Sequence, residues 1–152
     1  MKEAEAEKIY NTKVNEIQKQ MKKKGTTYLG ELNRIGRTMF GIKFKGVFPS
    51  DKIPPLNDLA PYCILNLDKS DEPGSHWISV AKSPKGDYSY CYDSFGRRNT
   101  DIIPTLKKSG NGRIIDTDYD ANQKVKELNC GQKSLGWLYM FDKYGEDVAK
   151  LI

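Results

Sequence analysis

The spacing of apolar side chains divides the chain into a helical first part and a strand-rich middle. Residues 3–24 carry apolar positions at helical spacing through a strongly charged segment, which predicts an amphipathic helix that ends at Gly25. Thr26 or Thr27 can cap a second helix. The apolar positions of that helix recur every three or four residues, at Leu29, Leu32, Ile35 and Met39. Core packing accounts for both stripes without any function.

Several segments in the middle of the chain favour extended structure. The first, residues 42–48, alternates apolar and polar side chains. Residues 76–81 and 88–93 have strand character on either side of a tight turn centred on Lys85 and Gly86, so we predict an antiparallel hairpin. Further predicted elements are strands at residues 62–67 and 113–117 and a short helix at residues 102–108.

The order of these elements predicts an α+β fold. Helices come first, a mostly antiparallel central sheet follows, and residues 133–141 are apolar enough for a buried helix at the end. The 152 residues are expected to form a single domain, with N-terminal helices in residues 1–40 and the sheet and core in residues 41–152.

Composition is typical of a globular protein of the cell interior. Hydrophobic residues make up 38% of the chain, and no apolar run approaches the roughly 20 residues that span a bilayer. The N-terminus lacks the apolar core of a signal peptide, so we expect an intracellular monomer that is neither secreted nor bound to a membrane. A net charge of +5 predicts salt-dependent attraction to polyanions such as DNA, although a solvated, lysine-rich surface explains the same charge.

Cysteine and histidine usage excludes several kinds of site. Three cysteines, Cys63, Cys91 and Cys130, have no CxxC spacing and fit neither a disulfide framework nor a zinc cluster. The single histidine, His76, excludes a histidine-rich metal site. We therefore expect at least one free thiol and no cofactor that the chemistry requires.

Cys130 stands where a polar loop gives way to the apolar final helix. At a helix start, backbone N–H groups and the helix dipole stabilise a thiolate, which is the form of cysteine that attacks carbonyl carbons. Taken alone, a buried cysteine is more often a small hydrophobic residue. A nucleophile also requires a base, and His76 is the only histidine in the chain.

The predicted hairpin brings Asp93, at the end of one strand, beside His76 at the start of the other. A carboxylate there can accept the imidazole N–H and stabilise the imidazolium. Cys130, His76 and Asp93 are therefore candidates for nucleophile, base and orienting acid.

Acyl transfer also needs hydrogen-bond donors for the developing oxyanion. The backbone N–H of Cys130 is one candidate, because the first amides of a helix have no partner within it. A side-chain amide of Asn122, Gln123 or Asn129 is a second, and spacing alone does not choose among them.

Together these residues resemble the adenovirus-type maturation proteases. These are papain-like cysteine proteases with a rearranged chain order, in which His and an acid precede Cys, and cellular proteases for ubiquitin-like proteins belong to the same group. The matching stretches are His76-Trp77, Asp93-Ser94-Phe95-Gly96, Gln123 and Asn129-Cys130-Gly131-Gln132. The resemblance covers roughly residues 62–144 and leaves the N-terminal helices unassigned.

The resemblance implies a role for each matching residue. His76 is the general base, Asp93 orients it, Cys130 is the nucleophile, Gln123 is an oxyanion donor and Trp77 flanks the substrate groove. The acid is often Glu in viral members and typically Asp in the cellular branch. Some adenoviral enzymes tether a peptide cofactor through a cysteine between acid and nucleophile, and this chain has none there.

The expected function is cleavage of viral capsid or core precursor proteins during virion maturation, at glycine-containing sites, by a cysteine endopeptidase in the virion or the host cell. Related virus and transposon lineages with similar proteases fit the same pattern. One alternative is a protease that deconjugates ubiquitin-like proteins. Another is a basic DNA- or capsid-binding protein without catalysis, in which Cys130 is only part of the core.

Overall fold

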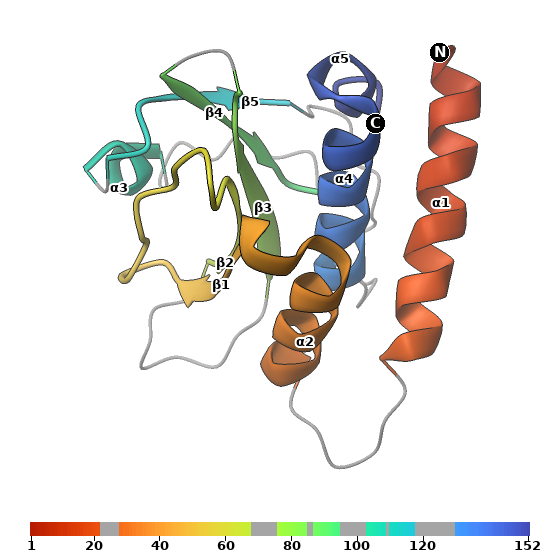
Figure 1. Cartoon of the computed structure of the whole chain (residues 1–152), viewed down its shortest axis with the longest axis horizontal. Coiled ribbons are helices and arrows are strands. Elements are labelled where there is room, and N and C mark those ends of the chain that lie inside the picture. Colours follow the sequence, from red (N-terminus) through yellow and green to blue (C-terminus); the bar gives the residue numbers. More distant parts are fainter. Residues whose placement is uncertain (22–27, 68–75, 85–86, 95–102, 109, 118–129) are drawn as a thin grey trace.

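The computed structural model of the chain describes residues 1–21, 28–67, 76–84, 87–94, 103–108, 110–117 and 130–152 (Figure 1). The fold is α+β, with helices packed on a central sheet, as predicted. In chain order the elements are α1 Glu3–Gln20, α2 Tyr28–Phe40, a 3-10 turn η1 Gly41–Lys43, β1 Phe44–Pro49, β2 Tyr62–Asn66, β3 Trp77–Lys82, β4 Tyr88–Tyr92, α3 Ile103–Lys108, β5 Arg113–Asp116, α4 Cys130–Tyr144 and α5 Glu146–Ala149.

The strands form one mixed sheet in the order β1-β2-β3-β4-β5. The inner pairs, β2–β3 and β3–β4, are antiparallel, whereas the outer pairs, β1–β2 and β4–β5, are parallel. The prediction of a mostly antiparallel sheet is therefore wrong. Two neighbouring strands can be parallel only if the connection between them returns the chain to the end of the sheet where the first strand began. The connections over residues 50–61 and 93–112 are long enough for this.

Helices α1, α2 and α4 lie on one side of the sheet, and α3 lies on the other (Figure 1). The main core fills the first side, where the ring of Tyr92 on β4 stacks on Trp137 of α4 with centroids 5.4 Å apart. A smaller core under α3 contains Cys63, Cys91 and Leu106. Every residue of β2 is buried, because both faces of the central strands are covered.

A close approach between α1 and α4 fixes the N-terminal helix to the main core. A Cβ added at Gly136 of α4 would lie 2.7 Å from Val14 Cγ2 and 3.2 Å from Tyr10 Cε1, so only glycine allows this spacing without rearrangement. The Tyr10 hydroxyl also reaches the buried hydroxyl of Tyr92, at 2.9 Å. The helix that the family resemblance left unassigned thus packs against both α4 and the sheet.

Most predicted elements are present, with differences at their ends. α1 ends at Gln20, and the predicted stop at Gly25 and caps at Thr26 or Thr27 lie outside the described residues. Leu29 is 47% exposed, so its predicted place in the buried stripe is wrong. This residue is the second of α2 and lies in its first turn.

Two short elements were not predicted from the pattern. η1 takes up the beginning of the predicted 42–48 strand, and Ile42 within it is 82% exposed. α5 follows α4 after Gly145, whose φ of 90° lies in the left-handed region that favours glycine. None of the helices in the described residues is long and apolar enough to cross a bilayer.

Candidate active site

The hairpin of β3 and β4 brings His76 to Asp93. Its register is centred between residues 85 and 86, as the predicted hairpin requires, and the predicted turn residues Lys85 and Gly86 lie outside the described residues. If this register is continued by one pair beyond Ser79 and Tyr92, Asp93 lies opposite Ile78. His76 is therefore a diagonal neighbour of Asp93 on the same face of the sheet, and not its direct partner. The His76 Nε2 and Asp93 Oδ1 atoms are 2.6 Å apart, and the two residues are only 5% and 1% exposed.

The backbone of His76 is held by the neighbouring strand. The Leu67 N–H donates to the His76 carbonyl oxygen at 3.1 Å, which extends the β2–β3 ladder by one residue beyond the pair Asn66 and Trp77. His76 is thus fixed by its main chain on one side and by Asp93 through its ring. Such double support restricts the orientation of the imidazole.

Cys130 is the first residue of α4 and is 5% exposed. The first turns of α4 lie against the start of β3, where the Ser134 hydroxyl donates to the Trp77 carbonyl oxygen at 3.1 Å. Cys130 is also near enough to His76 to raise the pKa of the imidazole. The structure therefore brings Cys130, His76 and Asp93 together at one end of the sheet.

The electrostatics of this group favour a protonated imidazole. Burial lowers the pKa of His76, but the hydrogen bonds and charges of Asp93 and Cys130 outweigh burial and raise the pKa above its ordinary value. A positive ring beside a thiol stabilises the thiolate, as does the helix N-terminus on which the thiol stands.

The other two cysteines have a different environment. Cys63 and Cys91 point into the small core under α3 and are 0% and 1% exposed. Burial raises the pKa of the Cys63 thiol to about 12. Burial, together with the charges of Asp116 and Asp93, also raises the pKa of Cys91 well above its ordinary value. Both thiols are therefore expected to stay protonated and unreactive.

Two further predicted site residues have less support. Trp77 is 5% exposed and its side chain belongs to the main core, so its role beside a substrate groove stays a prediction. Gln123 lies outside the described residues, as do Asn122 and Asn129, and the choice of a side-chain oxyanion donor stays open. The backbone N–H of Cys130 is in the first turn of α4, where amides have no partner within the helix.

Sequence reasoning missed Ser134 and the anchoring contact of Leu67. The available signal for Ser134 was its spacing, because a small polar residue four positions after Cys130 lies on the same face of a helix. The bond from Leu67 follows from strand pairing, and the sequence pattern does not specify which atoms pair at the end of a ladder.

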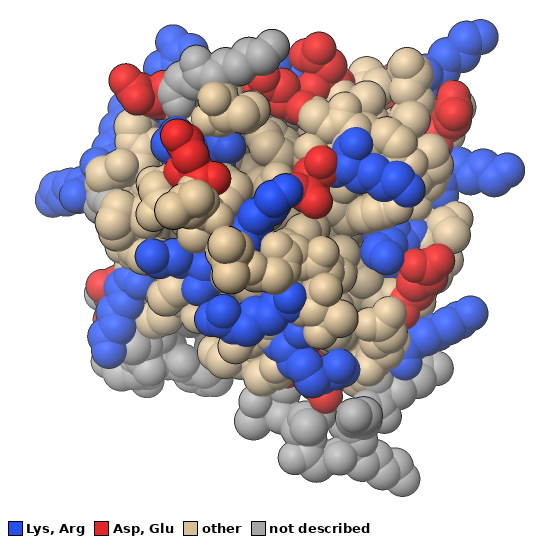
Figure 2. Space-filling view, in the orientation of Figure 1, with Lys and Arg blue, Asp and Glu red and all other residues tan. Residues whose placement is uncertain are grey.

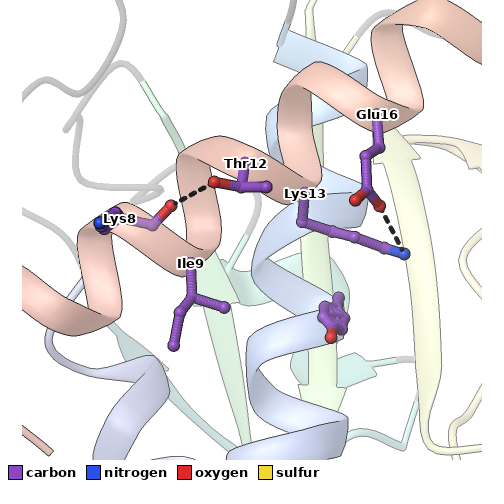
Figure 3. Close-up of a pocket in the computed structure, with 6 residues that line it drawn as sticks. Lys8, Ile9, Thr12, Lys13 and Glu16 are labelled. Carbon is purple, nitrogen blue, oxygen red and sulfur yellow. Dashed lines mark hydrogen bonds and ion pairs between the residues drawn. The ribbon is translucent and has the colours of Figure 1, made fainter.

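Several surface hollows between described residues lie away from Cys130. One, of about 220 Å³, lies between α1 and α4, where Figure 3 shows Ile9 and Lys13 pointing from α1 toward α4. Lys13 Nζ is 3.3 Å from Glu16 and 4.6 Å from the centroid of the Tyr139 ring. Lys13 thus already has a salt bridge and a ring contact within the protein, and packing between α1 and α4 accounts for this hollow.

A second hollow, of about 530 Å³, lies at the opposite end of α4 from Cys130. Asp142 in its wall accepts hydrogen bonds from Tyr62 at 2.8 Å and from Lys43 at 3.1 Å. Cys130 and Asp142 are twelve residues apart on one helix, which corresponds to about 18 Å. This cavity is therefore separate from the Cys130 group.

Lysine and arginine side chains are spread over the face seen in Figure 2, with acidic side chains and broad uncharged areas among them. No set of three metal-ligating side chains converges within the part of the chain that the structure describes.

No protein-family model matches the chain, and no curated protein matches it either.

Proposed function

We propose that the protein is a cysteine peptidase in which Cys130 is the nucleophile, His76 the general base and Asp93 the residue that orients it. One observation carries the proposal: the only histidine of the chain has a buried carboxylate 2.6 Å from its Nε2, and its pKa is raised in addition by a thiol at a helix start. A thiol, an imidazole and a carboxylate in this arrangement are the groups that acyl transfer requires.

The first half of the reaction transfers the acyl group to sulfur. Because Nε2 is bonded to Asp93, the other ring nitrogen, Nδ1, takes the proton of Cys130. The thiolate attacks the scissile carbonyl carbon, and the negative charge moves to the carbonyl oxygen, near the Cys130 N–H. The imidazolium then gives its proton to the leaving nitrogen, the C–N bond breaks, and a thioester with Cys130 remains.

The second half reverses these roles with water as the nucleophile. His76 Nδ1 takes a proton from the water, whose oxygen attacks the thioester carbon. The C–S bond breaks, the acid product leaves, and the proton returns to Cys130. Asp93 keeps its contact with the ring throughout and stabilises the positive charge there.

The proposed substrates are viral capsid or core precursor proteins, cleaved at glycine-containing sites during virion maturation. This narrower proposal depends on the similarity of the His76-Trp77 and Asn129-Cys130-Gly131 stretches to adenovirus-type maturation proteases. The net charge of +5 is suited to work near packaged nucleic acid, whose attraction for the protein should fall as salt rises.

The direct test incubates the protein with a denatured protein mixture and identifies new N-termini by mass spectrometry. We expect cleavage next to glycine that is lost in Cys130→Ala. Cys63→Ala is the matched control, because it removes a thiol that is buried in the other core. Cleavage by Cys130→Ala at the wild-type rate would contradict the assignment.

A deconjugating protease for ubiquitin-like proteins is the second candidate, and the acid at position 93 favours it, because Asp is typical of that branch. A ubiquitin-like protein with a C-terminal electrophile should label Cys130 only if this second function holds. Labelling of Cys130 by a short glycine-containing peptide electrophile, without labelling by the larger probe, supports the viral type of substrate.

A further inference from the structure

Ser134 connects the helix that carries Cys130 to the strand that follows His76. The Ser134 side chain is fully buried, and its hydroxyl donates to the carbonyl oxygen of Trp77 at 3.1 Å. In an α-helix the N–H of Ser134 bonds to the carbonyl four residues before it, which is that of Cys130. Trp77 follows His76 directly in the chain. The backbone of Cys130 is thus linked to that of His76 by the two hydrogen bonds of Ser134 and by the peptide unit between His76 and Trp77.

Near Ser134 the described side chains of α4 that pack on the main core are mainly apolar, whereas the hydrogen bond of Asp142 with Tyr62 lies at the other end of the helix. Leu135 and Leu138 of α4 are fully buried, and their contacts are not directional. Apolar packing has no preferred bond direction, whereas a hydrogen bond weakens steeply when its distance or angle changes. The Ser134 bond therefore limits the sliding and rotation of the first turns of α4.

The residue type at this position supports the same reading. Alanine would fit a small, fully buried site in a helix, and its helix propensity is higher than that of serine. A serine inside a helix commonly turns its hydroxyl back to the carbonyl four residues earlier. Here the hydroxyl of Ser134 crosses to Trp77 on β3 instead.

We propose that Ser134 is a positioning residue, which holds the Cys130 sulfur against the His76 ring through its hydrogen bond to the Trp77 carbonyl. This inference rests on the proposed function. It adds a contact that neither the helix start nor the hairpin supplies, because each of those positions only one member of the pair.

The test follows the titration of the imidazole by NMR, which gives one unambiguous signal because the chain has a single histidine. The variants are Ser134→Ala, Cys130→Ala and Ser89→Ala. Ser89 is the matched control, since it is a fully buried serine whose hydroxyl donates to a main-chain oxygen, that of Asn111, at 3.2 Å. Urea denaturation of each variant measures the loss of stability.

Cys130→Ala should lower the titration midpoint of His76, because the thiol group is one of the two partners that raise it. We expect Ser134→Ala to move the midpoint at least halfway from the wild-type value to that of Cys130→Ala. Ser89→Ala should lose a similar amount of stability and leave the midpoint unchanged. A purely structural role for Ser134 predicts that both serine variants titrate like the wild type, and that result would overturn the proposal.

Two other outcomes separate this inference from the peptidase proposal. If Ser134→Ala shifts the titration of His76 but the wild-type protein cleaves no peptide, the positioning role stands and the peptidase assignment fails. If Cys130→Ala leaves the titration unchanged, the thiol and the ring are not coupled, and the proposed role of Ser134 is refuted whatever the protein cleaves.

Discussion

The three cysteines should differ greatly in their reaction with iodoacetamide while the protein is folded. Only the thiolate attacks this reagent, so the rate depends on the fraction of each thiol that is ionised. Cys63 has a pKa raised to about 12 by burial, and at a pH of about 8 only about one Cys63 in 10,000 is ionised. An ordinary cysteine, with a pKa of about 8.5, is about one quarter ionised at the same pH.

The expected result is a single modification, on Cys130, more than about a thousandfold faster than on Cys63. Cys91 should also be slow, because burial and two carboxylates raise its pKa well above the ordinary value. Intact mass and peptide mapping over a series of times, between about pH 6 and pH 9, give the three rates. In guanidinium chloride all three should react at similar rates, which provides the internal control.

Replacement of the base separates two explanations for a fast Cys130. In His76→Ala the thiol keeps its place at the start of α4 but loses the positive ring, so its rate below neutral pH should fall at least about tenfold. Equal rates for Cys130 and Cys63 in the folded wild type would refute the thiolate–imidazolium pair. Fast modification of Cys63 in the folded protein would refute the reasoning from burial.

Two further substitutions test the pair and the packing around it. The folded pKa of His76 is raised, so its protonated ring stabilises the fold fully below about pH 6.5, and this stabilisation is lost as pH rises through the folded pKa. Asp93→Asn should therefore lower the free energy of unfolding, measured in urea, more at about pH 6 than at about pH 9, and an equal loss would contradict the assigned charge. Gly136→Ala should lower the free energy of unfolding, measured in urea, by about 1–2 kcal/mol, since its Cβ would lie 2.7 Å from Val14 Cγ2. Adding Val14→Ala to the same chain should recover part of that loss.

Local patterns predicted the half of the site that lies on one hairpin. His76 and Asp93 are 17 residues apart, and a turn at residues 85–86 is enough to set the register between them. The sequence did not distinguish a direct pair from a diagonal one, because the exact end of the ladder depends on which backbone atoms bond. The contact itself tolerates this uncertainty, since a diagonal neighbour is still within reach of an imidazole.

The directions of the outer strands could not be read from the pattern. β2 is buried along its whole length, so its side chains show no alternation that would identify its neighbours. Whether β1 joins it in parallel depends on how the 50–61 connection packs, which is a tertiary property. The start of α4 was predictable from the change from polar to apolar residues at Cys130. The position of that helix against β3 involves the hydrogen bond of Ser134, which the pattern does not reveal.

The burial of the His76–Asp93 pair bears on the choice between a functional and a structural role. Removing two such groups from water costs several kcal/mol per charge, and apolar residues of similar volume often give equal or greater stability. At the opposite end of α4, the ion pair of Asp142 with Lys43 stays partly exposed, as expected for a contact that only supports the fold. The His76–Asp93 pair is instead almost fully buried, next to a thiol on a helix N-terminus. Stability alone gives little reason to keep a histidine and an aspartate at that place, whereas a base that must stay oriented and must bear a positive charge after it accepts a proton requires both.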